Sequence, residues 1–313
     1  MSARTPRAFL GPAAVSVAAM LWATDGFWRN TLIQTMPSGA IVVWEHVILV
    51  IATGWLLVRE RRHIAALRPA EWLSVFLIGA GASGLATVLF TQAFSYATPT
   101  TVVLLHMTQP IFAISLASLM LPEPLPPRFW PLLPVALGGA YLIAFPDVSP
   151  FLSLGAGDRP LGVALALGAA VLWAAGTVLG RRMLAHVPYS TLTALRFASA
   201  LPALLVIAAL TGWGTPGPAE LPPLLATALV SGLLGLLLYY WGLRDTPAAV
   251  ATLCELWFPV TAIVVGALFL NTLPAPNQVI GIALLWIALA LMRHRPVPAT
   301  PETVGAALAP TPT

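Results

Sequence analysis

Lysine is absent from this chain of 313 residues, and all 15 basic residues are arginine. Charged residues of both signs make up only 8% of the chain, whereas soluble domains contain about 25%. Cysteine occurs once, as Cys254, which excludes an internal disulfide and a cysteine-based metal cluster. Without lysine there is no G-x-x-x-x-G-K-[ST] loop, so nothing indicates a nucleotide-driven pump. The small net charge of +4 does not indicate a nucleic-acid partner.

Hydrophobic residues make up 58% of the chain, which is more than a water-soluble fold can bury. A helix of about 20 apolar residues crosses the hydrocarbon core of a bilayer. Ten such stretches predict an all-α integral membrane protein with ten transmembrane helices, at approximately 12–33, 38–58, 71–95, 99–121, 128–146, 160–183, 189–211, 222–243, 247–270 and 277–293.

The arginines predict how these helices are oriented, because cytoplasmic loops are enriched in basic residues. If the N-terminus is placed in the cytoplasm, Arg159 is the only arginine on the outside face of the membrane. The inside faces collect twelve arginines, at positions 4, 7, 59, 61, 62, 68, 128, 181, 182, 244, 293 and 295. We therefore expect both termini in the cytoplasm and the chain in the cell (inner) membrane. Outside the spans, we expect a cytoplasmic N-terminus (1–11), an extracytoplasmic linker (147–159) and a disordered cytoplasmic tail (294–313).

The two halves of the chain resemble each other. "AAMLWATDGFWRNTLIQTMPSG" from Ala18 matches "AAVLWAAGTVLGRRMLAHVPYS" from Ala169 at an offset of 151 residues, which aligns Trp22 with Trp173. Later segments match at an offset of 149, which aligns His106 with Glu255 and Pro110 with Pro259. Since five spans is an odd number, the second half is expected to be inverted in the membrane. Inverted repeats are an architecture of secondary transporters.

These features together resemble the EamA-type proteins of the drug/metabolite transporter (DMT) superfamily. The resemblance covers residues 11–293 and rests on the "LW" of spans one and six, "LRF" at 195–197, and the prolines of spans four and nine. One departure is "WEH" at 44–46, where an arginine–phenylalanine pair is more usual. The resemblance implies two five-helix repeats, at 12–146 and 160–293, and export of amino acids or related amphipathic metabolites.

Several ionisable residues lie inside the predicted spans, where charge is costly and marks functional sites. Their depths predict two clusters. The inner cluster is the opposite-charge pair Arg196 and Glu255. The outer cluster contains Asp25, Arg29, Glu45 and His106. We expect these residues to bind substrate or to gate the path by alternating access. Fixed structural pairing remains an alternative for Arg196 with Glu255 and for Asp25 with Arg29, which are four residues apart on one helix.

Proline sets His106 and Glu255 apart from the other ionisable residues. Each lies four residues before a proline, Pro110 or Pro259, which cannot donate a backbone hydrogen bond. We therefore expect a helix break that leaves the carbonyls of His106 and Glu255 free, beside a titratable side chain. Such a turn favours a binding surface.

Aromatic residues supply the remaining candidates for substrate contact. Trp22 and Trp173 lie near mid-depth at equivalent positions, although tryptophan prefers the membrane interfaces. Tyr239 and Trp257 are further candidates on spans eight and nine. Packing alone is the alternative for Trp22 and Trp173.

The sequence thus predicts a secondary transporter of small organic metabolites, with a small-molecule substrate and the lipid bilayer as its partners. Proton coupling through His106 or Glu255 and facilitated diffusion both remain open, as do a monomer and a homodimer. The alternatives are an integral membrane enzyme, a non-transporting scaffold and a channel. The five histidines are scattered without metal-ligand spacing, and we expect neither a metal nor a cofactor.

Overall fold

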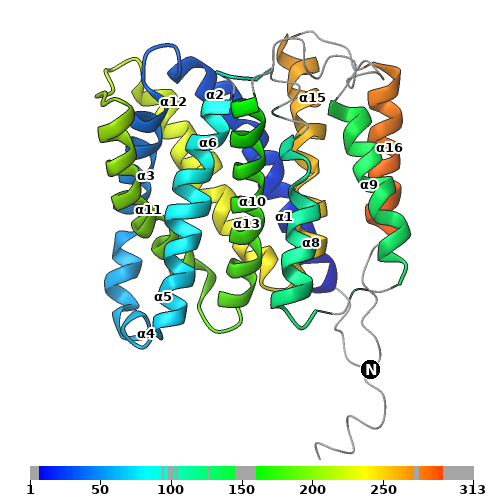
Figure 1. The fold of residues 1–313 in the computed structure, drawn as a ribbon, viewed down its shortest axis with the longest axis horizontal. Helices are drawn as coiled ribbons and strands as arrows, with labels where there is room; N and C mark the ends of the chain where they lie inside the picture. Colours follow the sequence, from blue (N-terminus) through cyan, green and yellow to red (C-terminus); the bar gives the residue numbers. More distant parts are fainter. Residues whose placement is uncertain are drawn as a thin grey trace, which may run out of the picture.

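The computed structural model describes residues 7–93, 95–97, 102, 105–123, 125, 127–144, 160–270 and 275–291. The predicted linker 147–159, the tail 294–313 and residues 1–6 of the N-terminal segment lie outside these described residues. Every regular element in the described part of the chain is a helix (Figure 1), in agreement with the predicted all-α fold.

The helices of the first half follow the predicted apolar stretches. They are α1 (Arg7–Ala23), α2 (Asp25–Leu32), α3 (Ser38–Arg59), α4 (Arg61–Ala65), α5 (Pro69–Phe76), η1 (Leu77–Leu85), α6 (Ala86–Ala93), α8 (Gln109–Met120) and α9 (Phe129–Ala144). The first helix begins five residues earlier than the sequence predicted, so part of the expected N-terminal tail is helical.

The helices of the second half repeat this order. They are α10 (Pro160–Met183), α11 (Tyr189–Thr211), α12 (Leu221–Ala226), η3 (Thr227–Leu234), α13 (Gly235–Leu243), α14 (Ala248–Cys254), α15 (Trp257–Leu270) and α16 (Pro276–Leu291). The first two coincide with the predicted spans 160–183 and 189–211, because a proline precedes or opens each helix and polar residues follow it.

Five of the apolar segments are long enough to cross a bilayer: Ser38–Arg59, Pro69–Ala93, Pro160–Met183, Tyr189–Thr211 and Leu221–Leu243. The other apolar helices are shorter, and the chain interrupts some of the predicted spans. The first predicted span breaks at Thr24, and the ninth breaks at Glu255 and Leu256.

Two of the long segments are not α-helical throughout. The middle of each is wound as a π-helix, η1 in the first half and η3 in the second, at positions about 150 residues apart. π-Helical turns are uncommon and frequently lie at functional sites. Their recurrence at matching places shows that both halves of the chain share this local geometry.

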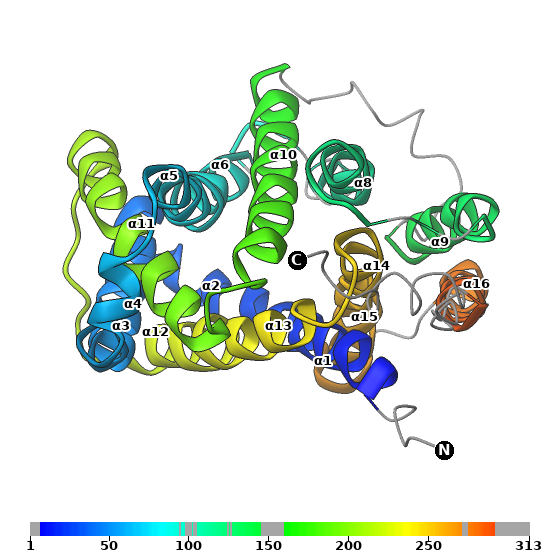
Figure 2. The same cartoon turned by 90° about the horizontal axis from the view of Figure 1, so that it is seen from below.

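The contacts between helices also recur. α1 packs against α13, α14 and α15 of the second half, and α10 packs in the same way against α6 and α8 of the first half. The pairs α3 with α11 and α9 with α16 join equivalent helices, and α8 contacts α14, which precedes the break in the equivalent span of the second half (Figure 2). Packing between the two halves is therefore largely reciprocal.

The α9–α16 pair crosses at two glycines. A Cβ atom on Gly139 would lie 2.7 Å from the carbonyl oxygen of Gly281, and one on Gly281 would lie 2.6 Å from that of Gly139. The absence of a side chain lets the two backbones touch, as in many membrane helix pairs.

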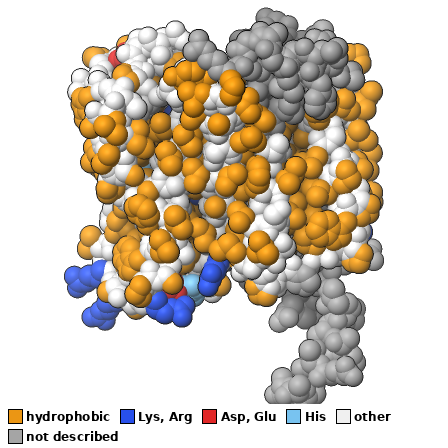
Figure 3. All heavy atoms as spheres, in the orientation of Figure 1, with side chains coloured by type: hydrophobic (Ala, Val, Ile, Leu, Met, Phe, Trp, Pro, Cys, Tyr) orange, Lys and Arg blue, Asp and Glu red, His pale blue; other side chains and the backbone are white. Residues whose placement is uncertain are grey.

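The surface separates into an apolar belt and a basic end. Side chains such as Ile51, Leu119 and Leu210, which are 76%, 83% and 82% exposed, contribute to the apolar surface (Figure 3). Basic side chains gather where α3, α4 and α5 meet, an end that we call the arginine end, with Arg59, Arg61, Arg62 and Arg68. The loop after α10 lies there too, because His186 Nε2 is 2.8 Å from Glu71 Oε1 of α5. α2 and α12 lie at the opposite end (Figure 1).

Candidate functional site

Two helix breaks face each other inside the bundle. α14 ends at Cys254 and α15 begins at Trp257, so Glu255 lies in the break. In the first half a turn at Met107 and Thr108 precedes α8, in which Pro110 lies in the first turn. The predicted interruptions near both prolines are therefore present.

The detail of the break at Glu255 differs from the prediction. Its carbonyl oxygen is not free, because it accepts a hydrogen bond of 2.9 Å from the backbone N–H of Phe258. The chain tightens to an i+3 turn before Pro259, as helix ends often do. The side chain of Glu255, rather than its backbone, is therefore the available polar group.

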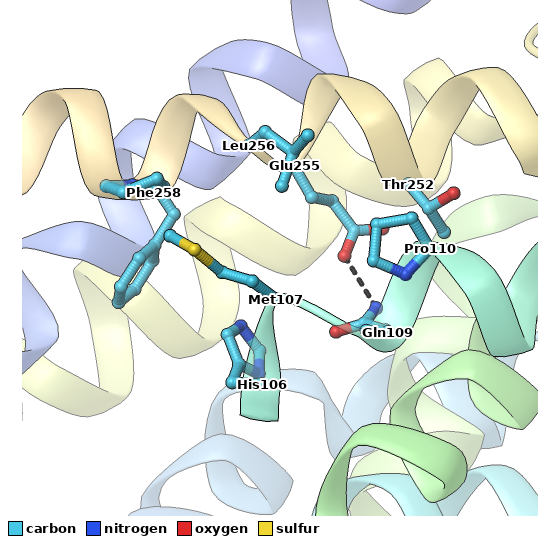
Figure 4. Close-up of a pocket in the computed structure, with 9 residues that line it drawn as sticks. His106, Met107, Gln109, Pro110, Thr252, Glu255, Leu256 and Phe258 are labelled. Carbon is cyan, nitrogen blue, oxygen red and sulfur yellow. Dashed lines mark hydrogen bonds between the residues drawn. The ribbon is translucent and has the colours of Figure 1, made fainter. Parts of the chain in front are cut away.

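A small cavity lies between the two breaks (Figure 4). Its free volume is about 20 Å³, which is room for about one water molecule. Eight of the nine residues that line it form four pairs related by the offset of 149, and Thr252 is the ninth. The pairs are His106 with Glu255, Met107 with Leu256, Gln109 with Phe258, and Pro110 with Pro259.

Glu255 is held at this cavity by neutral donors from two other helices. Gln109 Nε2 donates to Glu255 Oε2 at 2.8 Å, and the Tyr239 hydroxyl donates to Oε1 at 2.8 Å (Figure 4). Figure 4 draws the bond from Gln109, and Tyr239 is not among the side chains shown in that view. The Tyr239 hydroxyl also lies 2.7 Å from the Thr177 hydroxyl of α10. Both carboxylate oxygens are thus satisfied without a direct cation.

The predicted ion pair between Arg196 and Glu255 is not formed. Arg196 donates instead to the Ser83 hydroxyl and, at 3.1 Å, to the Tyr240 hydroxyl. The two adjacent tyrosines, Tyr239 and Tyr240, separate the charges, each bonding to one of them. The depth of each residue in the membrane could not predict these partners, because it does not specify the direction of the side chain around the helix axis.

His106 lies with the second-half residues rather than in the predicted outer cluster. Its ring is 4.9 Å from that of Trp173 and 6.0 Å from that of Phe258. Its Nδ1 atom is buried and has no hydrogen-bond partner among the described residues. A buried polar atom without a partner at a cavity is costly unless a ligand group or water satisfies it.

The two mid-depth tryptophans occupy equivalent surroundings. Trp22 packs on Tyr239 with ring centroids 5.0 Å apart, and its indole N–H donates to the Ser231 carbonyl of η3 at 3.1 Å. Trp173 packs on Phe90, the counterpart of Tyr239, at 5.2 Å. Trp22 therefore packs on the tyrosine that bonds to Glu255, whereas Trp173 contacts both Phe90 and His106 directly.

Trp257 does not line the cavity. Its ring lies 5.3 Å from that of Trp286 on α16, away from the residues of the helix break. Two positions beyond Glu255, the helix has turned by about 200°, which points the tryptophan to another face.

The rest of the predicted outer cluster is present at the opposite end from the arginine end. Arg29 Nε lies 2.7 Å from Asp25 Oδ2, as the spacing of four predicted. Arg29 Nη2 lies 2.9 Å from Glu45 Oε1 of α3, an ion pair without the alignment of a hydrogen bond. One guanidinium thus links the two acids.

The residues that the sequence analysis did not single out carry much of the geometry. Gln109, Phe90 and Phe258 were detectable, because the offset of 149 places them opposite Phe258, Tyr239 and Gln109. Ser83 and Thr177 had no such signal. They look like ordinary helix-packing residues until Arg196 and Tyr239 are seen to contact them.

Comparison with known proteins agrees with this organisation. The model of the EamA-like transporter family matches residues 9–145 and again residues 160–293. The chain is 31% identical over 293 residues to a protein of Fusobacterium nucleatum subsp. nucleatum named riboflavin transporter ImpX, covering 89% of this chain and 96% of that one. A crystal structure is similar with a TM-score of 0.72 at 17% identity, over 88% of this chain and 94% of its own. The chain is a multi-pass membrane protein and belongs to the EamA-like transporter family.

Proposed function

We propose that this protein is a secondary transporter of small aromatic metabolites, with riboflavin as the first candidate substrate. The observation that carries the proposal is the cavity at which Glu255 and His106 meet between two helix breaks. Discontinuous helices at corresponding positions of two halves mark the substrate site in several transporter folds. The proposed location is the cell membrane.

The proposed architecture is ten spans in two inverted five-helix repeats. The reciprocal helix contacts and the paired π-helices support it. The arginine end is proposed to face the cytoplasm, in keeping with the enrichment of basic residues on that side. Both termini then lie inside.

Transport is proposed to proceed by alternating access. A cavity with room for about one water cannot hold a metabolite, so binding requires α8 and α14 to separate. Because these helices belong to the equivalent broken spans of the two halves, their separation is proposed to open the path.

The chemistry of the site favours a planar substrate with polar edges. Trp173, Phe90 and Phe258 offer aromatic faces around His106, and Glu255 and Gln109 offer an acceptor and an amide. The relative named as a riboflavin transporter supports a flavin. Amino acids are the second candidate, because Glu255 and Arg196, one acid and one guanidinium, lie on either side of the tyrosine pair and match a zwitterion.

Glu255 is also the proposed site of proton coupling. Its direct partners are neutral, and the other ionisable groups around it are His106 across the cavity, Tyr239 and, beyond Tyr240, Arg196. A carboxyl group in such surroundings can exchange a proton without losing an ion pair. Facilitated diffusion is the competing mechanism, and Glu255→Gln separates them. Under proton coupling the variant stops responding to an imposed pH gradient.

Counterflow of labelled riboflavin in proteoliposomes tests the function. We expect accumulation driven by unlabelled riboflavin on the opposite side, a weaker signal in Glu255→Gln, and full signal in the control Glu60→Gln at the arginine end. Counterflow with amino acids but not with riboflavin would identify amino acids, the second candidate, as the substrate class. Absence of counterflow with either class would favour an enzyme or a scaffold. Running the assay in both directions tests the export that the sequence predicted.

A further inference from the structure

Three helices converge between the cavity and the arginine end, and one small residue from each is buried at their meeting point. These residues are Ala117 of α8, Val178 of α10 and Ala248 of α14, which are 5%, 0% and 0% exposed. The partly buried Leu116 and Leu121 pack against them. This apolar contact, which we call the plug, joins the three helices at that level.

Beyond the plug, Glu123 ties the same three helices together. Its Oε1 atom accepts a hydrogen bond of 2.6 Å from Arg181 Nε in the last turn of α10. Its Oε2 atom accepts one of 2.9 Å from the backbone N–H of Ala248, the first residue of α14. Glu123 itself follows α8 in the chain. Both carboxylate oxygens are therefore used to join three separate elements.

Arg181 extends this tie to a fourth element. Its Nη1 atom donates to the carbonyl oxygen of Arg244, in the connection between α13 and α14. The side chains of Arg181 and Glu123 are 24% and 16% exposed, so the pair is only partly shielded from water. A partly exposed ion pair contributes modestly and can break and re-form, because water replaces the lost partner.

Glu123 also has space into which it can withdraw. A second, more open cavity of about 510 Å³ reaches it from the side of α9, lined in part by Ser118 and Trp130. Movement of the carboxylate or of its loop toward that space would free Arg181 and the Ala248 N–H together.

The other half of the chain carries no charged counterpart of this tie. At offsets of 151 and 149 residues, the positions that match Arg181 and Glu123 are Asn30 and Thr272. The ion pairs at the opposite end, between Arg29 and the acids Asp25 and Glu45, join other positions, so the Glu123–Arg181 contact is not a product of the repeat. A tie needed only for stability of the shared fold would be expected at both ends.

We propose that Glu123 and Arg181 form the gate of the transporter at the arginine end. The gate holds α8, α10 and α14 over the plug, and its release lets the three helices part so that the cavity communicates with that side. This inference rests on the proposed alternating access. It assigns gating to two residues that contact neither the cavity nor the substrate.

Chemical accessibility of the plug tests the gate without any substrate. In a Cys254→Ser background, Ala117→Cys provides one thiol in the plug, and a small membrane-permeant maleimide reports water access from either side. We expect slow labelling that accelerates about fivefold in Glu123→Gln and in Arg181→Gln, the change expected from loss of one partly exposed ion pair. Arg182→Gln, the exposed neighbour on α10, is the matched control and should leave the rate unchanged. Equal labelling rates in all four proteins would overturn the gate, whatever the transport assay shows.

A cross-link provides the second test and does not depend on the stability of charge variants. Ala117→Cys with Ala248→Cys, again with Cys254→Ser, should form a disulfide that fixes the plug closed. Counterflow should cease under oxidation and return after reduction, whereas continued counterflow in the oxidised protein would overturn the proposal. If the reduced protein also shows no counterflow, while the labelling rates respond as expected, the gate stands and the proposed substrate is wrong.

Discussion

His106 and Glu255 stand at equivalent positions of the two halves, each four residues before a proline, and both line the same cavity. A base and an acid thus replace each other across the internal repeat. The internal repeat places a helix break at the same position in each half. Because one break carries a histidine and the other a glutamate, the cavity presents different chemical groups on its two sides, as binding of an asymmetric substrate requires. The consequences can be tested on four sets of variants.

Tyr239→Phe should weaken the site while keeping its shape. The ring continues to pack on Trp22, but Glu255 loses one of its two hydrogen bonds. Loss of a hydrogen bond to a charged group costs about 1.5–3 kcal/mol, so we expect at least a tenfold loss of substrate affinity or a matching loss of stability. Tyr240→Phe is the comparison, because its hydroxyl bonds to Arg196 instead. Indistinguishable binding curves for Tyr239→Phe and the unaltered protein would argue against a role for Glu255 in binding.

Glycine at the α9–α16 crossing should tolerate no side chain. Gly139→Ala places a methyl group 2.7 Å from the Gly281 carbonyl oxygen, and overpacking of this kind costs about 1–3 kcal/mol. Gly138→Ala meets no atom within 4 Å and should be neutral or stabilise by about 0.5–1 kcal/mol through helix propensity. Thermal unfolding in detergent compares the two adjacent variants, and equal melting temperatures would contradict the close backbone contact.

Arg29 should be needed because it neutralises two acids at once. Arg29→Gln leaves Asp25 and Glu45 close together without their cation, and removing one partner of a buried ion pair costs about 3–5 kcal/mol. The double variant Arg29→Gln with Glu45→Gln should recover part of that loss, since one of the two unpaired charges is gone. Unfolding in denaturant measures both. A double variant less stable than the single one would mean that Glu45 has a different partner.

Trp173 and Trp257 should differ in their effect on transport. Trp173→Leu removes a ring that contacts His106 and Phe90 at the site, whereas Trp257→Leu removes one that packs on Trp286. A stacking contact is worth about 0.5–1.5 kcal/mol beyond the apolar area, so we expect up to about a tenfold rise in substrate KM for Trp173→Leu alone. Initial rates of uptake over a range of substrate concentrations give both values. A larger rise in Trp257→Leu would place the substrate near α16 instead.

Most helix positions could be predicted from the sequence, because local hydrophobicity and proline determine where each helix begins and ends. The helices 160–183 and 189–211 begin and end at their predicted residues, since lipid demands uninterrupted apolar helix and the proline marks each start. The winding of η1 and η3 as π-helix was not readable. Neither segment has a sequence pattern that we could assign to this winding, and contacts such as the bond from Trp22 to the Ser231 carbonyl of η3 are visible only in the structure.

The residues of the candidate site were easier to predict from the sequence than the hydrogen bonds and ion pairs between them. Glu255, His106, Tyr239 and the two prolines were identified from charge, aromaticity and the repeat, and the structure brings four of these five residues to or around one cavity, with Tyr239 bonded to Glu255. The Arg196–Glu255 pair was wrong because matching depth says nothing about direction around the helix axis. Two tyrosines lie between the charges: the Tyr239 hydroxyl bonds to Glu255, and the Tyr240 hydroxyl bonds to Arg196.

The π-helices make chain length itself a constraint in the third span of each half. η1 follows Glu71, which contacts His186 at the arginine end, and contains Ser83, which accepts a bond from Arg196. Removing one residue within 77–82 would rotate everything on one side of the deletion by roughly 100°. Either the loop contact or the arginine contact would then face the wrong neighbour. A single-codon deletion in this segment therefore changes the angle between two distant contacts.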